Sequence, residues 1–441
     1  MKLPAKSIQQ VDVNIEDYYA VRLGAVWRGF KEESAAFKWL CFYIILEYVR
    51  PASLYPVIDV LPWTQLALLF AAFTAMSEKS IKWVKTPATQ LDIVFMLLVL
   101  LSSVLAFRSA SSYATIDVPL IWVFVYILII NVVNTERRFI LFLLLFFLIN
   151  FKMSQHGFST FAMRGFSYSA WGVAGSPGWF RNAGDFGIAM AVFVPLLLSF
   201  IFALRQNWGK YKRWFFYFVV FTAVMSVLAS SSRGAQLGLV SAGLWFVLKS
   251  EKAVKALLIA SVLGVIMYSS MSDEMLAEYQ DAGEDDTSEN RLAHWAWGWE
   301  VAKDYPVLGV GYSNWLVYCD YHNPNGVHDD FRGRCLLPHN TYVELLAEMG
   351  WVGMVFYLWI VFYIFVSNVK TRKLAKGKGN SFVGYISHGL DGGLVAYLIS
   401  SIFYSVLFYP FLWITLAMTV VVRQLAIKGS KELGAENIKS R

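Results

Sequence analysis

Long apolar runs separated by short polar segments fill most of the chain. About twelve of them approach the roughly 20 mostly apolar residues that a bilayer-spanning helix needs. These runs cover residues 36–50, 54–77, 91–107, 118–133, 138–151, 186–204, 213–230, 234–248, 253–270, 341–367, 386–408 and 409–427. The run at 138–151 is short for a span and is also typical of a re-entrant or buried helix. The pattern predicts an all-α polytopic membrane protein with about twelve transmembrane helices, within one or two.

The composition supports this prediction. Hydrophobic residues make up 57% of the 441 residues and charged residues 16%, and the mean hydropathy is +0.50. Soluble domains have roughly 45–50% apolar and 25% charged residues, so a soluble enzyme is excluded. The net charge of +7 does not indicate nucleic-acid binding, because the basic residues fall in short clusters between apolar runs and form no continuous stripe.

The basic clusters give the orientation of the predicted spans. They follow the even-numbered spans, and short cytoplasmic loops carry the excess of Lys and Arg, so both termini are predicted to be cytoplasmic. The clusters are Lys79, Lys82 and Lys85; Arg137 and Arg138; Arg205, Lys210, Lys212 and Arg213; Lys249, Lys252 and Lys255; and Lys370, Arg372, Lys373, Lys376 and Lys378. We therefore expect a cytoplasmic segment at 1–35, nine spans in 36–270, one large outer loop at 271–340, three spans in 341–427 and a cytoplasmic tail at 428–441.

The predicted outer face is unusually rich in arginine. Arg233 follows three serines in a tight turn between two apolar runs, and Arg291 precedes Trp295, Trp297 and Trp299 in the large loop. A guanidinium group presents a planar fork of donors that matches two phosphate oxygens, so these arginines indicate an anionic ligand, with phosphate the best match. The alternative for Arg233 is snorkelling to lipid headgroups, and the tryptophans equally suit an aromatic belt.

A histidine stands just before the tenth predicted span. Thr341 and Glu344 have the spacing of a capping box, which places His339 two residues ahead of the helix and near its positive end. That setting favours the neutral imidazole that a general base needs. The alternative is that His339 only bonds the loop backbone. Glu348, one turn beyond Glu344, is a functional candidate because an ionisable group in an apolar helix is costly.

Other familiar constellations are missing from the sequence. It contains no phosphate-loop motif, no HExxH and no GxSxG. The histidines of the outer loop lack tight metal-ligand spacing, and the acidic run at 273–289 breaks the spacing of an EF-hand, so we expect no metal. Cys319 and Cys335 share the outer loop and could pair if that loop is exported.

Three short segments of the chain carry motifs that can be compared with known families. They are Ser232-Arg233-Gly234 between two spans; Arg291 to Trp295 leading to Asp304-Tyr305-Pro306-Val307-Leu308-Gly309-Val310-Gly311; and His339-Asn340 followed, after nine residues, by Gly350-Trp351-Val352-Gly353. Together they span roughly residues 180 to 370, and in this arrangement they resemble the O-antigen ligase and polymerase superfamily of bacterial polytopic membrane proteins.

The resemblance implies a glycosyltransferase at the periplasmic face of the bacterial inner membrane. Its donor would be a glycan on undecaprenyl diphosphate, and no metal or other cofactor would be required. Arg233 and Arg291 would hold the diphosphate, and His339 would activate the acceptor hydroxyl. Residues expected to support the site are Arg181, Asn182, Asp185, Asn340, Glu344 and Glu348. For Asn182, a helix cap is the simpler alternative role.

The shared motifs leave the acceptor open. A ligase joins the glycan to lipid A core, a polymerase extends an O-antigen or exopolysaccharide on its own carrier, and relatives glycosylate protein. A secondary transporter is the alternative from another class, but it needs ionisable residues near the bilayer midplane, where Glu47 and Glu348 are the main candidates. The expected partners are membrane lipids, the lipid-linked glycan and the acceptor, without nucleic acid; the oligomeric state stays open.

Overall fold

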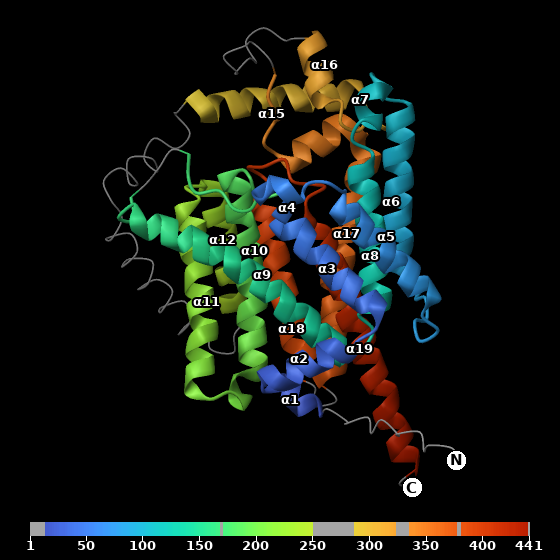
Figure 1. The fold of residues 1–441 in the computed structure, drawn as a ribbon. Helices are drawn as coiled ribbons and strands as arrows, with labels where there is room; N and C mark the ends of the chain where they lie inside the picture. The colour runs from blue at the N-terminus through green and yellow to red at the C-terminus, as the bar shows by residue number, and fades with distance from the viewer. Residues whose placement is uncertain (1–13, 168–170, 250–285, 323–334, 377–380, 440–441) are drawn as a thin grey trace.

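A computed structural model describes residues 14–167, 171–249, 286–322, 335–376 and 381–439 of the chain (Figure 1). Over these ranges the structure consists of helices and connecting turns, with no strand. The predicted all-helical class is therefore correct for the described residues. The predicted span at 253–270 and the acidic run up to residue 285 lie outside them.

Eight of the described helices are long and apolar enough to cross a bilayer. They are α6 (Pro87–Val104), α9 (Glu136–Met163), α10 (Ala183–Leu204), α11 (Lys210–Ala229), α17 (Thr341–Lys376), α18 (Ser381–Ser400), α19 (Pro410–Lys439) and the stretch Ser109–Val132, which comprises α7 (Ser109–Tyr113) and α8 (Asp117–Val132). Shorter helices α3 (Ala35–Val49), α5 (Trp63–Ser77) and α12 (Arg233–Lys249) coincide with three further predicted spans. The chain is a multi-pass membrane protein, and the count of twelve spans stays a prediction.

Helix α9 is much longer than the apolar run at 138–151 that predicted it. It runs from Glu136 to Met163, so the concern that this segment is too short to span was wrong. Lys152, Gln155 and His156 interrupt the apolar run, but they lie on the exposed side of the helix, whereas Met153 and Gly157 on the other side are buried. The helix therefore continues as an amphipathic segment.

The last two helices are separated by a loop where the apolar pattern predicted continuous spans at 386–408 and 409–427. Helix α18 ends at Ser400, and α19 begins at Pro410, a residue that suits the first position of a helix. Val406 in the intervening loop is fully buried. Each residue at 401–409 is buried or partly buried, and most of them are apolar, so the sequence pattern alone made this loop look like a span.

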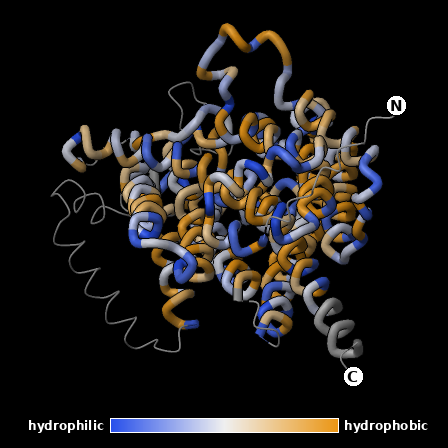
Figure 2. The backbone as a smooth tube through the Cα atoms, turned by 60° about the horizontal axis from the view of Figure 1, so that its bottom comes forward, coloured by the Kyte–Doolittle hydropathy of each residue, from blue (hydrophilic) through white to orange (hydrophobic). Residues whose placement is uncertain are grey.

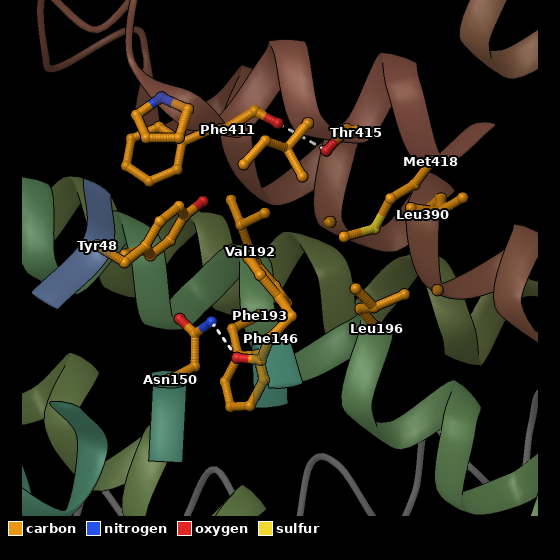
Figure 3. A pocket seen from close by; sticks show the side chains of 15 residues that line it. Tyr48, Phe146, Asn150, Val192, Phe193, Leu196, Leu390, Phe411, Thr415 and Met418 are labelled. Carbon is orange, nitrogen blue, oxygen red and sulfur yellow. Dashed lines mark hydrogen bonds between the residues drawn. The ribbon is translucent and has the colours of Figure 1, made fainter. Parts of the chain in front are cut away.

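Helices α10, α12 and α18 pack closely against one another. A Cβ atom on Gly389 of α18 would lie 2.8 Å from the side chain of Ser199 on α10, so the small residue permits the close approach. A void of about 30 Å³ remains between α3, α9, α10, α18 and α19, and Figure 3 shows its mostly apolar lining. Figure 2 shows apolar residues distributed over the helices of the whole bundle.

The two ends of the bundle differ in what they carry. Helices α15 (Asp286–Asp304) and α16 (Trp315–His322) lie at one end, with α15 crossing the axes of the long helices (Figure 1). Helices α1 (Ile15–Tyr19) and α2 (Leu23–Glu32) lie at the opposite end, as does the C-terminal part of α19. The described part of the predicted outer loop therefore sits opposite the terminal elements.

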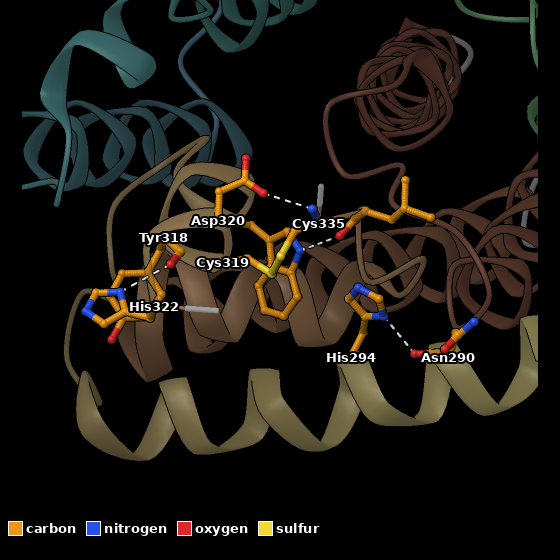
Figure 4. Close-up of a disulfide and its surroundings, with 9 residues drawn as sticks. Asn290, His294, Tyr318, Cys319, Asp320, His322 and Cys335 are labelled. Carbon is orange, nitrogen blue, oxygen red and sulfur yellow. Dashed lines mark hydrogen bonds between the residues drawn. A yellow bond between two sulfur atoms is a disulfide. The ribbon is translucent and has the colours of Figure 1, made fainter. Parts of the chain in front are cut away.

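A disulfide joins Cys319 of α16 to Cys335, in the segment that leads to α17 (Figure 4). The carboxylate of Asp320 accepts a hydrogen bond from the Cys335 amide at 2.8 Å, and the Trp315 indole donates to the Leu336 carbonyl at 2.8 Å. These contacts fix the segment that leads to His339 against α16.

Candidate functional site

Arg233 is positioned by the turn at the start of α12. The Ser232 hydroxyl caps the helix by accepting a hydrogen bond from the Ala235 amide at 3.2 Å. The Ser400 hydroxyl donates to the Gly234 carbonyl at 3.1 Å. Arg233 is half-buried at the first position of the helix, so its backbone is held against the end of α18.

Arg291 lies on α15, one turn before Trp295. The Trp295 indole donates a hydrogen bond to the Pro338 carbonyl at 2.8 Å, which ties α15 to the segment carrying His339. The His294 imidazole donates from Nδ1 to the Asn290 carbonyl at 2.7 Å, as Figure 4 shows. The Nε atom of Arg291 is enclosed without a hydrogen-bond partner among the described residues. A buried donor without a protein acceptor is uncommon, so this atom marks the arginine as a candidate for ligand binding.

His339 adopts a left-handed backbone conformation with φ of 47°, which is uncommon for a residue other than glycine. The next residue, Asn340, caps α17 by accepting hydrogen bonds from the Tyr342 and Val343 amides at 2.9 and 3.1 Å. The prediction that Thr341 is the cap was therefore wrong. The Thr341 hydroxyl instead donates to the Tyr404 carbonyl at 2.6 Å. His339 still lies two residues ahead of the helix, as expected.

The structure brings Arg233, Arg291 and His339 together around Tyr404, in the loop between α18 and α19. The rings of His339 and Tyr404 have centroids 6.4 Å apart. Burial raises the pKa of the Tyr404 phenol. A hydrogen bond with the Ser232 hydroxyl opposes this rise, as do the positive charges of Arg291 and Arg233. The Tyr404 phenol therefore lies close enough to both arginines for their charges to affect its pKa, and its ring lies beside the His339 ring.

The sequence pattern did not reveal Tyr404, because its loop is apolar and resembles the end of a transmembrane helix. The signal that could have revealed it is the pair Ser400-Ser401 followed by Pro410, which brackets a break between two helices. Gly184 of α10 leaves room for the phenol, since a Cβ atom there would lie 1.9 Å from the Tyr404 hydroxyl oxygen.

The electrostatics of the cluster favour a neutral histidine and an anionic ligand. Burial, the charge of Arg291 and the charge of His294 lower the pKa of His339 to about 4. The imidazole is therefore neutral at pH 7 and can accept a proton. Two half-buried arginines at one mouth of the bundle concentrate positive charge where an anion can be bound.

The residues expected near the start of α10 take different roles. Asn182 caps the helix by accepting a hydrogen bond from the Gly184 amide at 2.8 Å, which confirms its simpler role. Asp185 is buried and accepts a hydrogen bond from the Tyr409 hydroxyl at 3.1 Å. Its charge also acts on Tyr404, so Asp185 borders the cluster. Arg181 is exposed just outside the helix.

Glu344 does not form the expected capping box. It lines a cavity of about 370 Å³ together with Ser405, Tyr409 and Glu348. The Thr341 amide, which a capping-box carboxylate would accept from, donates to the Ser401 carbonyl at 2.9 Å. Glu344 therefore faces a chamber next to the Tyr404 loop, and its predicted capping role was wrong.

Glu348 holds the backbone of the loop between α15 and α16. One carboxylate oxygen accepts from the Ser313 amide at 2.9 Å and the other from the Trp315 amide at 2.8 Å. The same loop approaches the helix closely at two glycines: a Cβ atom on Gly309 would lie 2.3 Å from the Glu348 carbonyl carbon, and one on Gly350 would lie 2.4 Å from the Val307 oxygen. Two of the three sequence motifs therefore pack directly against each other, and these glycines serve packing.

Replacing Glu348 by glutamine is expected to destabilise the protein by about 1–3 kcal/mol, because a glutamine NH₂ group would face a backbone amide that also needs an acceptor. Thermal unfolding in detergent measures this effect. Glu300→Gln, on the exposed face of α15, is the matched control and should change stability little. Equal stability of the Glu348→Gln variant and the wild type would contradict the anchoring role.

The described ranges hold no group of three or more His, Cys, Asp or Glu side chains placed to bind a metal ion. The absence of a metal requirement stays a prediction.

The fold and the cluster define a polytopic helical membrane protein with cations and a neutral histidine gathered at one end. Residues 218–358 match the family model described as O-antigen ligase, a family of membrane glycosyltransferase-type enzymes. The predicted resemblance is thereby confirmed over a segment that contains Arg233, Arg291 and His339. A search of curated proteins found no match. Tyr404 and Asp185 lie outside the matched residues.

Proposed function

We propose that this protein transfers a glycan from undecaprenyl diphosphate to an acceptor hydroxyl at the periplasmic face of a bacterial inner membrane, as an O-antigen ligase does with lipid A core. The observation that carries this proposal is the meeting of Arg233, Arg291 and His339, from three separate segments, around Tyr404. The O-antigen ligase match over the same segments supports it.

In this reaction the acceptor oxygen attacks the anomeric carbon while His339 takes its proton. The bond between that carbon and the diphosphate oxygen breaks, and undecaprenyl diphosphate leaves with the electron pair. Arg233 and Arg291 stabilise the charge that develops on the leaving oxygens, an effect that often exceeds other single contributions to catalysis. A single displacement of this kind inverts the anomeric centre, and the proton then passes from His339 to water.

The membrane orientation of this proposal places both termini in the cytoplasm and the Arg–His cluster on the periplasmic side. Two features support it. The basic clusters predict cytoplasmic loops at the end opposite α15. The Cys319–Cys335 disulfide lies at the same end as the cluster, and disulfides persist mainly in oxidising compartments such as the periplasm.

The two main carboxylates that could support a transporter are committed to internal contacts. Glu47 pairs with Arg50 at 3.5 Å and accepts a hydrogen bond from the Trp179 indole. Glu348 binds two loop amides, as described above. These contacts leave neither residue suited to cycle a coupling ion, which supports the enzyme over the transporter.

The test is transfer by purified protein in liposomes that contain a glycan on undecaprenyl diphosphate. Lipid A core, a second lipid-linked glycan and an unfolded protein substrate are offered separately, and product mass identifies the acceptor. We expect transfer to lipid A core, whereas transfer to another acceptor alone would identify a polymerase or a protein ligase. Folded protein that transfers to no acceptor contradicts the proposal and directs attention to flux assays with Glu47 variants.

A further inference from the structure

A second cavity lies far from the Arg–His cluster, toward the end of the bundle that carries α1 and α2. It measures about 610 Å³ and is formed by the segment leading into α6, the second half of α17 and the middle of α19. It shares no lining residue with the chamber beside Glu344. Its contents are therefore separate from the transfer site.

Four cations line this cavity: Lys85, Lys370, Arg423 and Lys428. None of its described lining residues is acidic. The Nη1 atom of Arg423 and the Nε2 atom of Gln424 are enclosed, and neither has a hydrogen-bond partner in the described part of the chain. Lys428 donates to the Asn134 carbonyl at 2.8 Å but keeps its charge. The cavity thus presents buried donors and positive charge to whatever occupies it.

Two other arginines toward this end of the bundle, Arg138 and Arg372, have acidic partners. Arg138 pairs with Glu33 at 2.7 Å and with Glu78 at 3.1 Å. Arg372 pairs with Asp391 at 2.6 Å. A partly enclosed guanidinium without a counter-charge is costly, so the contrast between Arg423 and these two arginines indicates that an external anion neutralises the cavity.

The remaining wall of the cavity is apolar and faces outward. Trp359 and Phe362 line it and are 52% and 63% exposed, on a helix that crosses the membrane. Such side chains suit contact with lipid acyl chains rather than with water. A free phosphate ion would use the cations and leave this wall uncovered, whereas a phospholipid uses both.

We propose that this cavity binds one anionic phospholipid from the leaflet at the end of the bundle that carries α1 and α2. Its phosphate lies against Arg423 and the lysines, and its acyl chains run along Trp359 and Phe362. Basic pockets between transmembrane helices recognise lipid headgroups in this manner. The site does not depend on the proposed transfer reaction.

The test uses the full chain in mixed micelles with equal amounts of phosphatidylglycerol and phosphatidylcholine, and native mass spectrometry counts the retained lipids. We expect wild type to retain phosphatidylglycerol preferentially, even with excess inorganic phosphate. The double variant Lys370→Gln with Arg423→Gln should lower the ratio of the two bound lipids about 25-fold, since each cation contributes about fivefold. The matched control, Arg205→Gln with Lys210→Gln, removes two exposed cations outside the cavity and should keep the wild-type ratio.

Three results would overturn the proposal: no lipid preference in wild type, a wild-type ratio in the double variant, or an equal loss in the control. The last would indicate general attraction of anionic lipid to a basic surface. Size-exclusion chromatography checks that the variants are folded. If the double variant is not folded, Lys370→Gln alone decides, because Lys370 is exposed, and we expect about a fivefold change.

Discussion

Replacing His339 by alanine is expected to lower the rate of glycan transfer by about 10²–10⁴-fold, which is the usual contribution of a positioned general base. The imidazole is the neutral base that the Arg–His cluster offers to an incoming hydroxyl, because burial and then the charges of Arg291 and His294 lower its pKa. Initial rates with purified protein in liposomes measure the effect. The donor should still bind, because the arginines remain.

The pH profile gives a second readout of the same group. With its pKa lowered to about 4, His339 is neutral above that value, so kcat/KM should stay level from neutral pH down to about pH 5 and fall below it. A bound diphosphate brings negative charge, which favours the imidazolium and raises this pKa. The acid limb of kcat should therefore lie at higher pH than the acid limb of kcat/KM.

His156→Ala is the matched control for the histidine prediction, since His156 is exposed on α9. It should retain the wild-type rate and the same pH profile. A folded His339→Ala protein that transfers glycan within a few-fold of wild type would remove His339 from the mechanism, and the outer arginines would then require another explanation.

Replacing Arg291 by alanine is expected to lower kcat by about 10²–10³-fold, the cost of removing one group that stabilises developing negative charge. Lysine at this position should recover only part of the rate, because an ammonium lacks the bidentate fork that matches two phosphate oxygens. The removal of this charge should also raise the pKa of His339, since Arg291 contributes to its lowering. The acid limb of kcat/KM in the alanine variant should accordingly move to higher pH.

Arg108→Ala serves as the control for the arginine prediction. Arg108 is exposed beside α7 (Ser109–Tyr113), and its backbone amide rather than its side chain is held by Asn314. This variant should transfer glycan at the wild-type rate. If Arg108→Ala and Arg291→Ala lose activity equally, general surface charge rather than a defined diphosphate site explains the dependence on arginine.

The sequence was informative where one physical requirement dominates. Lipid exposure demands apolar residues, so the helix positions could be predicted from hydropathy, and the turn before α12 was visible as a polar interruption carrying Arg233. The meeting of Arg233 with His339 could be stated only as a requirement, because it depends on contacts between segments about a hundred residues apart.

Predictions failed where two requirements give the same residues. A buried loop and a membrane span are both apolar, so residues 401–409 were taken for helix and Tyr404 was overlooked. Asn340 and Thr341 are both good helix caps, and the choice depends on the Tyr404 carbonyl, which binds the Thr341 hydroxyl. Neither outcome is encoded within a short window of sequence.

The loop between α15 and α16, which is bound by Glu348, packs against α17 at a point where this helix is interrupted. The helix departs from helical geometry at Gly350, where φ is 64°, and the loop supplies the missing contacts: the Val310 amide donates to the Ala347 carbonyl at 2.8 Å, and the Trp351 amide donates to the Pro306 carbonyl at 2.8 Å. Inside a membrane, backbone groups without partners are costly. A straight α17 and a docked loop therefore exclude each other. The orientation of the part of α17 before Gly350, which begins next to His339, is thermodynamically linked to docking of the loop.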